Sequence, residues 1–266
     1  MKLYIKACSS YKGDIKEFNV KKELKQKYKL DTRRQDTFIH LAVYGAQKLK
    51  ENTDISRDDE LYVTSGVGNI DVLQKTNNYV HRLNEFIKPF DFINMLGNTT
   101  SYYVASSLGV KGKNTFQISD NFTYINTLIS IFASLNVSNK DAILGSIDLA
   151  TQPDEVIKRV LGLDEATEVT SSVNYQKFSL SEDDSIASVE FDTKIYSLSE
   201  IKELIEKSSS KVFSSMRCEE LETQKEGGYF ETMASFAVNR GIETKEDLIY
   251  IDCYEGAYKV LNLTII

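Results

Sequence analysis

The chain has 266 residues, of which 41% are hydrophobic and 27% are charged, as in an ordinary globular protein. Its net charge of -7 argues against nucleic acid as the main partner, because a phosphate backbone requires a basic face. No apolar run approaches the ~20 residues that span a bilayer, and the N-terminus lacks a secretion-signal pattern. We therefore expect no membrane contact and a cytoplasmic location.

The metal-binding and nucleophilic residue types are few. The three cysteines, Cys8, Cys218 and Cys253, are widely spaced, and only two histidines accompany them. These spacings assemble no zinc-like ligand set, so free thiols are expected and neither a metal nor another cofactor is predicted.

Strands and helices alternate along the first 165 residues. The first residues form a strand, and a helix with apolar positions at helical spacing follows from Asp36 or Thr37. Strand, glycine turn and helix then follow twice, at DELYVTSGVGNID and at NTFQIS with NFTYINTLISIFASLN, before a further strand, DAILGSID. This order predicts an α/β fold with a parallel or mixed sheet covered by helices.

The pattern changes after residue 165. SIASVEFDTKIYSL alternates as a strand does, and Ser197 with Glu200 forms the pattern of a helix capping box. GGYFETMASFAVNRG predicts a helix entered and left through glycine, and the last twenty residues predict a hairpin about YEGAY. With only 2 prolines and no linker, we expect one continuous unit with an N-terminal half (1–165) and a shortened C-terminal half (166–266).

Most of the reactive residues have a structural interpretation. TSGVGN lacks the lysine of a phosphate-binding loop, and His40 and His81 have no reactive neighbour at motif spacing. The stretch VKKELKQKYK, with Arg33 and Arg34, is the one basic concentration in the chain. It is either a solvated helix face or a landing surface for an acidic partner.

The stretch GKNTFQISDNFTYIN, residues 112 to 126, has the form of an approach to a catalytic nucleophile. A glycine turn leads to a short strand and then to a helix. The position where the nucleophile would lie holds Asn121.

The segment PFDFINMLGNTTSYYVASSLGVKGKN, which leads into that stretch, resembles the β-ketoacyl synthase family. RRQDTFIHLAVYGAQKL, TSGVGNID, DAILGSIDLA and YQKFSLSEDDSIASVEFD are similar to further family segments in the same order. The resemblance covers residues 1 to about 192 and is weaker beyond. It implies a thiolase-like, layered α-β-α-β-α fold with an abbreviated C-terminal half.

The departures from the family pattern concern its chemistry. The family uses a cysteine at a helix N-terminus and two histidines. Counted from Gly112, the cysteine position falls on Asn121, and no histidine follows residue 81. Gly227 and Gly228 stand near the place of one family histidine, and the Gly-Glu-Gly-Ala turn is replaced by Ser-Glu-Asp-Asp.

The resemblance therefore implies a non-catalytic subunit similar to a chain length factor, including the abbreviated ApeC-like partners of aryl polyene pathways. Such a subunit forms a heterodimer with an active β-ketoacyl synthase and shapes its acyl tunnel in polyketide, polyene or fatty-acid-type chain elongation. An acyl carrier protein would be a transient partner, meeting the basic stretch near residues 20 to 34. Two alternatives stay open: a malonyl carrier protein decarboxylase that uses Asn121, and a homodimeric module that binds acyl chains or carrier proteins.

The resemblance also indicates which apolar side chains line the tunnel or the dimer contact. These candidates are Val67, Ile70, Leu73, Phe92, Met95 and Phe122. Each of them is equally compatible with a place in the hydrophobic core.

Overall fold

The computed structural model describes residues 1–14, 18–119, 121–150 and 154–266. The strands are β1 (Lys2–Gly13), β2 (Glu60–Ser65), β3 (Asn114–Ile118), β4 (Ala142–Asp148), β5 (Ser171–Ser179), β6 (Ala187–Phe191), β7 (Lys211–Ser214), β8 (Leu248–Tyr254) and β9 (Ala257–Ile265). The helices are α1 (Val20–Gln26), α2 (Thr37–Lys50), α3 (Ile70–His81), α4 (Pro89–Met95), α5 (Gly97–Leu108), α6 (Thr123–Ser138), α7 (Glu155–Leu161), α8 (Leu198–Lys207) and α9 (Met233–Thr244). The alternation of strands and helices predicted from the sequence is confirmed.

The described strands form one mixed sheet in the order β3-β2-β4-β5-β1-β6-β9-β8-β7. β2 is parallel to both β3 and β4, whereas β5 is antiparallel to β4 and to β1. β1 also pairs with β6, and this pairing joins the two ends of the sheet.

The two ends of the sheet share one topology. We call β2, β4, β5 and β1, with β3, the first unit, and β7, β8, β9 and β6 the second unit. In the first, β2 lies parallel to β4, which is followed by the antiparallel strands β5 and β1. In the second, β7 lies parallel to β8, which is followed by the antiparallel strands β9 and β6. The described residues of the second unit include no strand equivalent to β3; backbone bonds from the segment at Gln224 reach β7 instead. The division at residue 165 stays a prediction.

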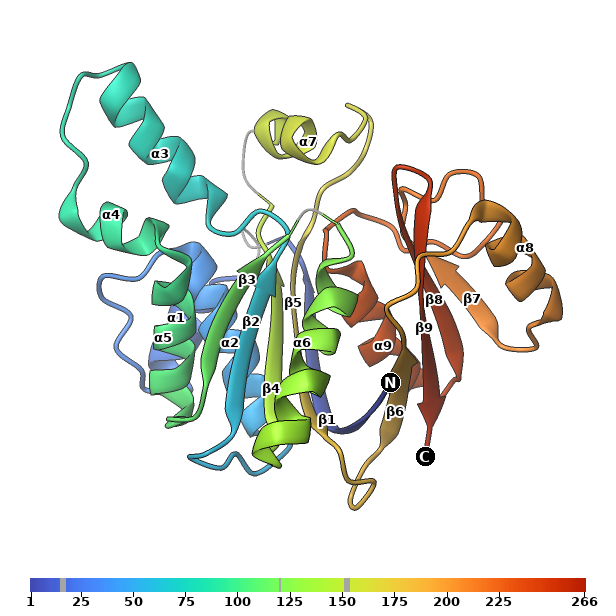
Figure 1. Ribbon diagram of the computed structural model, residues 1–266. Helices are drawn as coiled ribbons and strands as arrows, with labels where there is room; N and C mark the ends of the chain where they lie inside the picture. The colour runs from blue at the N-terminus through green and yellow to red at the C-terminus, as the bar shows by residue number, and fades with distance from the viewer. Residues whose placement is uncertain (15–17, 120, 151–153) are drawn as a thin grey trace.

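Three hydrophobic clusters separate the molecule into layers (Figure 1). α1, α2 and α5 pack on one face of β2, β4 and β5. α6 and α9 pack between the opposite face of these strands and the strands β6, β8 and β9. α8 covers the outer face of the second unit. The predicted α-β-α-β-α layering is confirmed.

The local signals for helix ends have mixed outcomes. Asp36 accepts the amide hydrogen of Ile39 and caps α2, and Ser197 with Glu200 forms a complete capping box at α8. The prediction that the last helix ends at glycine is wrong, because α9 continues through Gly241 to Thr244. A Cβ atom at Gly241 would lie 2.5 Å from a methyl carbon of Leu263, so this glycine lets the helix approach the sheet closely.

The predicted strand at SIASVEFDTKIYSL is shorter than expected, because the continuous strand covers Ala187–Phe191 and beyond it Tyr196 forms a single bridge with Tyr258. The C-terminal hairpin is confirmed, with β8 and β9 joined at Glu255 and Gly256. In the part of the chain that the structure describes, no helix is both long and apolar enough to cross a membrane.

Replacing Gly145 with alanine should destabilise the protein by about 1–3 kcal/mol, because overpacking forces a buried ring to move. The new Cβ atom would lie 2.3 Å from the ring of Tyr175, which is fully buried opposite Gly145. Urea unfolding of the variant measures the effect. Gly227→Ala is the control, because no atom lies within 4 Å of the Cβ position there. Equal stability of the two variants would contradict the expected crowding.

Candidate functional site

The turn between β3 and α6 keeps the form of a nucleophile turn. β3 ends at Ile118, α6 begins at Thr123, and Phe122 caps the helix with φ 46° and ψ 29°. A left-handed backbone is uncommon outside glycine, and such strain is concentrated at functional turns. The residue at the strained helix end is thus Phe122, one position after the Asn121 that sequence spacing indicates.

The polar groups around this turn bond to its backbone. The Ser119 hydroxyl donates to the carbonyl oxygen of Asn121 at 2.7 Å, and the Thr123 hydroxyl donates to the carbonyl oxygen of Ser119. Activation of a hydroxyl nucleophile requires an adjacent general base instead. These bonds stabilise the turn and give neither hydroxyl a catalytic geometry.

Phe122 is buried at this helix end, beside a lysine from the C-terminal hairpin. The ammonium group of Lys259 lies 5.6 Å from the centre of the Phe122 ring and donates to Asn126 Oδ1 at 2.7 Å. Burial lowers the pKa of Lys259, while the charges of Asp192 and Asp252 act in the opposite direction. A cation–π contact therefore occupies the space beside the strained residue.

A buried carboxylate ties the ends of β2 and β4 to the start of α9. Asp148 Oδ1 accepts hydrogen bonds from the Ser65 hydroxyl at 3.2 Å and from the Gly66 amide at 2.9 Å. Asp148 Oδ2 accepts from the amide and the hydroxyl of Thr232, both at 2.8 Å. Burial raises the pKa of Asp148, and its hydrogen bonds partly offset that rise. We call this group the Asp148 junction.

A second buried polar cluster belongs to the second unit. It lies next to the Asp148 junction, because Glu231 directly precedes Thr232 in the chain. Arg217 Nη1 lies 3.3 Å from Glu231 Oε2, which also accepts a hydrogen bond from the hydroxyl of Tyr229. The Arg217 guanidinium lies 5.5 Å from the ring centre of Tyr229 and 5.6 Å from that of Tyr254. It borders a hollow of about 660 Å³ between the segment 159–167 and the β8–β9 turn.

Two acids near Arg217, Glu231 and the buried Asp252 of β8, hold their protons more tightly than usual. Burial raises the pKa of Glu231 well above its ordinary value, against the effect of Arg217. Burial raises the pKa of Asp252 to about 7, again against the effect of Arg217. No pattern in the sequence predicts this cluster, because its residues come from separate segments and share no motif spacing.

Asp252→Asn should remove a pH-dependent part of the stability. The pKa of Asp252 is about 7 in the folded chain against an ordinary 3.8, so the folded state binds the extra proton. Its contribution is complete below pH 3.8 and is lost as the pH rises to 7. The unfolding free energy of the wild type should therefore fall relative to that of the variant across that range, by on the order of 4 kcal/mol at most. A difference that is independent of pH in urea titrations would contradict the raised pKa.

The histidines and cysteines lie in other environments. His40 is buried in α2, with Nε2 3.2 Å from the carbonyl oxygen of Thr32, and His81 is exposed at the end of α3. Cys218 and Cys253 are buried against α8, and burial together with Glu243 raises the pKa of Cys8 to about 12. Within the described residues, no group of three or more His, Cys, Asp or Glu could hold a metal ion.

The six apolar candidates from the sequence lie in different environments. Ile70 and Phe122 are buried, and Val67 and Met95 are partly buried. Leu73 and Phe92 are exposed by 45% and 51% on α3 and α4. The candidates thus divide between the core and a surface that no described residue covers.

α3, α4 and the residues between them project from the body as an arm, residues 70–96 (Figure 1). The Lys75 ammonium lies 2.8 Å from Asp91 Oδ1, and the Thr76 hydroxyl lies 3.3 Å from the sulfur of Met95, so the two helices are held together. Large apolar side chains are exposed along the arm: Leu73, Val80, Leu83, Phe86, Phe90, Phe92, Ile93 and Leu96. Exposed apolar surfaces of this extent mark protein interaction sites.

The free edge of the sheet lies beside this arm. β3 pairs only with β2 among the described strands, so its other edge is open. The carbonyl oxygen of Lys113 and the amide of Ser119 form hydrogen bonds with β2. Because the backbone groups of successive residues in a strand point to alternate sides, those of Asn114, Phe116 and Ile118 point outward. An open edge of this kind is a template for pairing with another chain.

Comparison with known proteins identifies the architecture. No family model and no curated protein sequence matches the chain. The ishigamide ketosynthase/chain length factor superposes with a TM-score of 0.72 at 11% identity, covering 100% of both chains. The fold is thiolase-like.

Two further structures show how widely this thiolase-like fold is shared. The 3-oxoacyl-(acyl carrier protein) synthase III of Pseudomonas aeruginosa PAO1 matches with a TM-score of 0.56 at 10% identity, over 100% of both chains. The complex of the ketosynthase ApeO with its chain length factor ApeC from Xenorhabdus doucetiae matches with a TM-score of 0.54 at 9% identity. That match covers 87% of this chain and 79% of the other. Thus the thiolase-like neighbours include both a synthase and complexes with chain length factors.

Proposed function

We propose that this chain is a non-catalytic, chain-length-factor-like subunit that forms a heterodimer with an active β-ketoacyl synthase. The observation that carries the proposal is the turn before α6, where the thiolase-like frame is retained and the described residues supply no cysteine. Asn121 and the buried ring of Phe122 occupy the helix end, and the chain has no cysteine between residues 8 and 218. A carboxamide and a phenyl ring cannot form the thioester of acyl transfer.

The surface around β3 supports a partner of similar architecture. The open strand edge and the apolar arm lie on the same side of the first unit (Figure 1). Pairing of two β3 edges would satisfy outward-facing backbone groups, and the arms would bury their apolar side chains against the partner. Phe92 and Leu73 on the arm are then interface residues, and the more buried Val67, Ile70, Met95 and Phe122 stay candidates for the tunnel wall. Through this contact the chain would shape the acyl tunnel of the synthase.

Native mass spectrometry after co-expression tests the pairing. With the synthase encoded nearest to this chain, the proposal predicts a 1:1 complex that survives gel filtration. The chain alone should self-associate or precipitate, because its apolar arm stays uncovered. Separate elution of the two proteins, with the synthase fully active by itself, would contradict the proposal.

A further inference from the structure

Two of the three cysteines meet on the outer face of the second unit. Cys253 lies on β8, and the alternation of a strand places its side chain on the same face as that of Ile251, toward α8. Cys218 lies between two turns that follow β7, and its thiol donates to the carbonyl oxygen of Ile251 at 3.7 Å. The thiols of Cys218 and Cys253 are in hydrogen-bonding contact. Two residues that are far apart in the sequence thus form one dithiol pair.

Backbone hydrogen bonds hold the segment of Cys218 against β8. β7 pairs with β8 as far as Ser214 and Ile251, and the amide of Ser215 donates to the carbonyl oxygen of Ile251 at 2.9 Å. The amide of Cys218 in turn donates to the carbonyl oxygen of Ser215 at 3.0 Å. Because Cys218 itself lies outside the strand ladder, its backbone can shift toward Cys253 without breaking a hydrogen bond of the sheet.

The two thiols differ in their access to solvent and in their acidity. Cys253 lines the hollow of about 660 Å³ between the segment 159–167 and the β8–β9 turn. Cys218 is fully buried, and the hydrogen bond from Cys253 together with burial raises its pKa. Since the thiolate is the reactive form of cysteine, a dissolved oxidant meets Cys253 first, and Cys218 reacts second.

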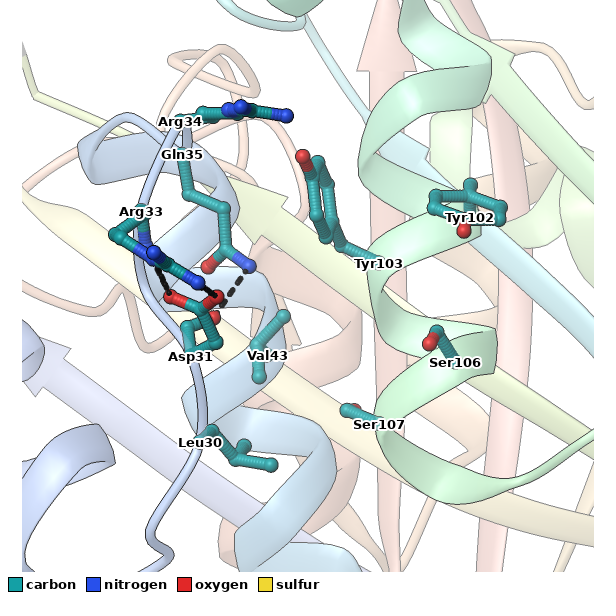
Figure 2. Close-up of a pocket in the computed structure, with 10 residues that line it drawn as sticks. All are labelled: Leu30, Asp31, Arg33, Arg34, Gln35, Val43, Tyr102, Tyr103, Ser106 and Ser107. Atoms are coloured by element: carbon teal, nitrogen blue, oxygen red, sulfur yellow. Dashed lines mark hydrogen bonds and ion pairs between the residues drawn. The ribbon is translucent and has the colours of Figure 1, made fainter.

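Cys8 and a further hollow of the first unit lack this combination. Cys8 lies on β1 opposite Gln176 of β5, away from both other cysteines. The hollow of about 400 Å³ beside α5 is lined by guanidinium, carboxylate and hydroxyl groups, and the residues drawn around it include no cysteine (Figure 2). Of these two hollows, the one beside β8 is therefore the one that brings solvent to a thiol pair.

We propose that Cys218 and Cys253 form a reversible disulfide when the chain meets a hydroperoxide. The thiolate of Cys253 attacks one peroxide oxygen, the O–O bond breaks, and the other oxygen leaves as hydroxide, which takes up a proton to become water. Cys253 is then a sulfenic acid. The sulfur of Cys218 attacks the sulfur of this acid, the S–O bond breaks, and the leaving hydroxide takes the proton of Cys218 to form a second water. The two sulfurs together lose two electrons, which the peroxide accepts.

The disulfide would change how the wall of the hollow is held. Arg217 directly precedes Cys218, and its Nη2 donates to the carbonyl oxygen of Leu161 at 2.9 Å. Oxidation would thus add a covalent bond to β8 at a wall that hydrogen bonds hold in the reduced chain. The pair lies in the second unit, whereas the arm lies between β2 and β3 of the first. The inference is therefore independent of the proposed pairing with a synthase.

Peptide mapping of the full chain after treatment with hydrogen peroxide tests the proposal. Trypsin places the two cysteines in separate peptides, 218–225 and 246–259, which only a disulfide would join. The wild type should yield the joined pair, and dithiothreitol should separate it. The cross-link should also raise the thermal unfolding midpoint by roughly 5–10 °C, because it constrains the unfolded chain.

Three alanine variants assign a role to each thiol. Cys218→Ala should give no joined peptide, and dimedone, a reagent for sulfenic acids, should label Cys253 because the second thiol is absent. Cys253→Ala should give neither the joined peptide nor a label on Cys218. Cys8→Ala is the matched control and should form the cross-link as the wild type does. Urea unfolding of the reduced variants checks that each is folded, and the wild-type mapping stands without them.

A second oxidant removes the dependence on peroxide entering the hollow. Equilibration with oxidised and reduced glutathione should give the same joined peptide, with one glutathione thiol released at each of two exchange steps. Three results would overturn the inference: absence of the joined peptide with both oxidants, a midpoint shift that persists in Cys218→Ala, and an equal yield of cross-links to Cys8. All of these measurements use the chain alone, so failure of the heterodimer to form leaves their outcome unchanged.

Discussion

Replacing Phe86 and Phe92 together with glutamate should abolish the heterodimer while leaving the chain folded. Their side chains are exposed by 97% and 51% on the arm, so charges there cost little in the free subunit. In the complex these charges would be buried without partners. Aromatic anchors of an interface each contribute about 2 kcal/mol or more, so the double variant should weaken pairing on the order of a thousandfold.

The measurement is sedimentation equilibrium with the synthase, together with urea unfolding of the free variant. Ile195→Glu is the control, because Ile195 is about as exposed as Phe92 but precedes α8 in the second unit. The control should pair as the wild type does. A double variant that keeps wild-type affinity would show that the arm is not the interface.

Asp148→Ala should destabilise the protein by roughly 3 kcal/mol or more, the largest stability effect that we expect for a single substitution. The carboxylate accepts four hydrogen bonds from two segments, and its loss leaves the amides of Gly66 and Thr232 buried without an acceptor. Each such unsatisfied buried group costs about 1–3 kcal/mol.

Thermal and urea unfolding measure this loss, and Asp148→Asn should lie between the alanine variant and the wild type because it retains one oxygen acceptor. Asp164→Ala serves as the control at an exposed aspartate. If Asp148→Ala were no less stable than Asp164→Ala, the Asp148 junction would not hold the two units together.

Local signals in the sequence predicted much of the fold, because they depend on neighbouring residues. The caps at Asp36 and Ser197 and the hairpin at β8 and β9 are of this kind. The strand, turn and helix around Asn121 were predicted from spacing, and the strained backbone at Phe122 was not. A left-handed conformation in a phenylalanine is imposed by the surrounding structure, which the local sequence does not encode.

Long-range features could not be predicted in this way. The shared topology of the two units depends on strand pairing and not on repeated letters, and β7 ends the sheet where the first unit continues to β3. Arg217 follows β7 and Glu231 precedes α9, and the two meet only in the folded chain. Likewise, an apolar residue on a helix gives the same signal in the sequence whether it is buried, as Ile70 is, or exposed, as Leu73 is.

The central claim, that this chain assists chemistry without performing it, is tested most directly with malonyl carrier protein and the purified heterodimer. Asn121→Ala in this chain should leave chain elongation unchanged, whereas replacing the nucleophilic cysteine of the synthase should abolish it. The chain alone should release no CO₂. Release of CO₂ by the chain alone, lost in Asn121→Ala, would contradict the account and identify the chain as a decarboxylase.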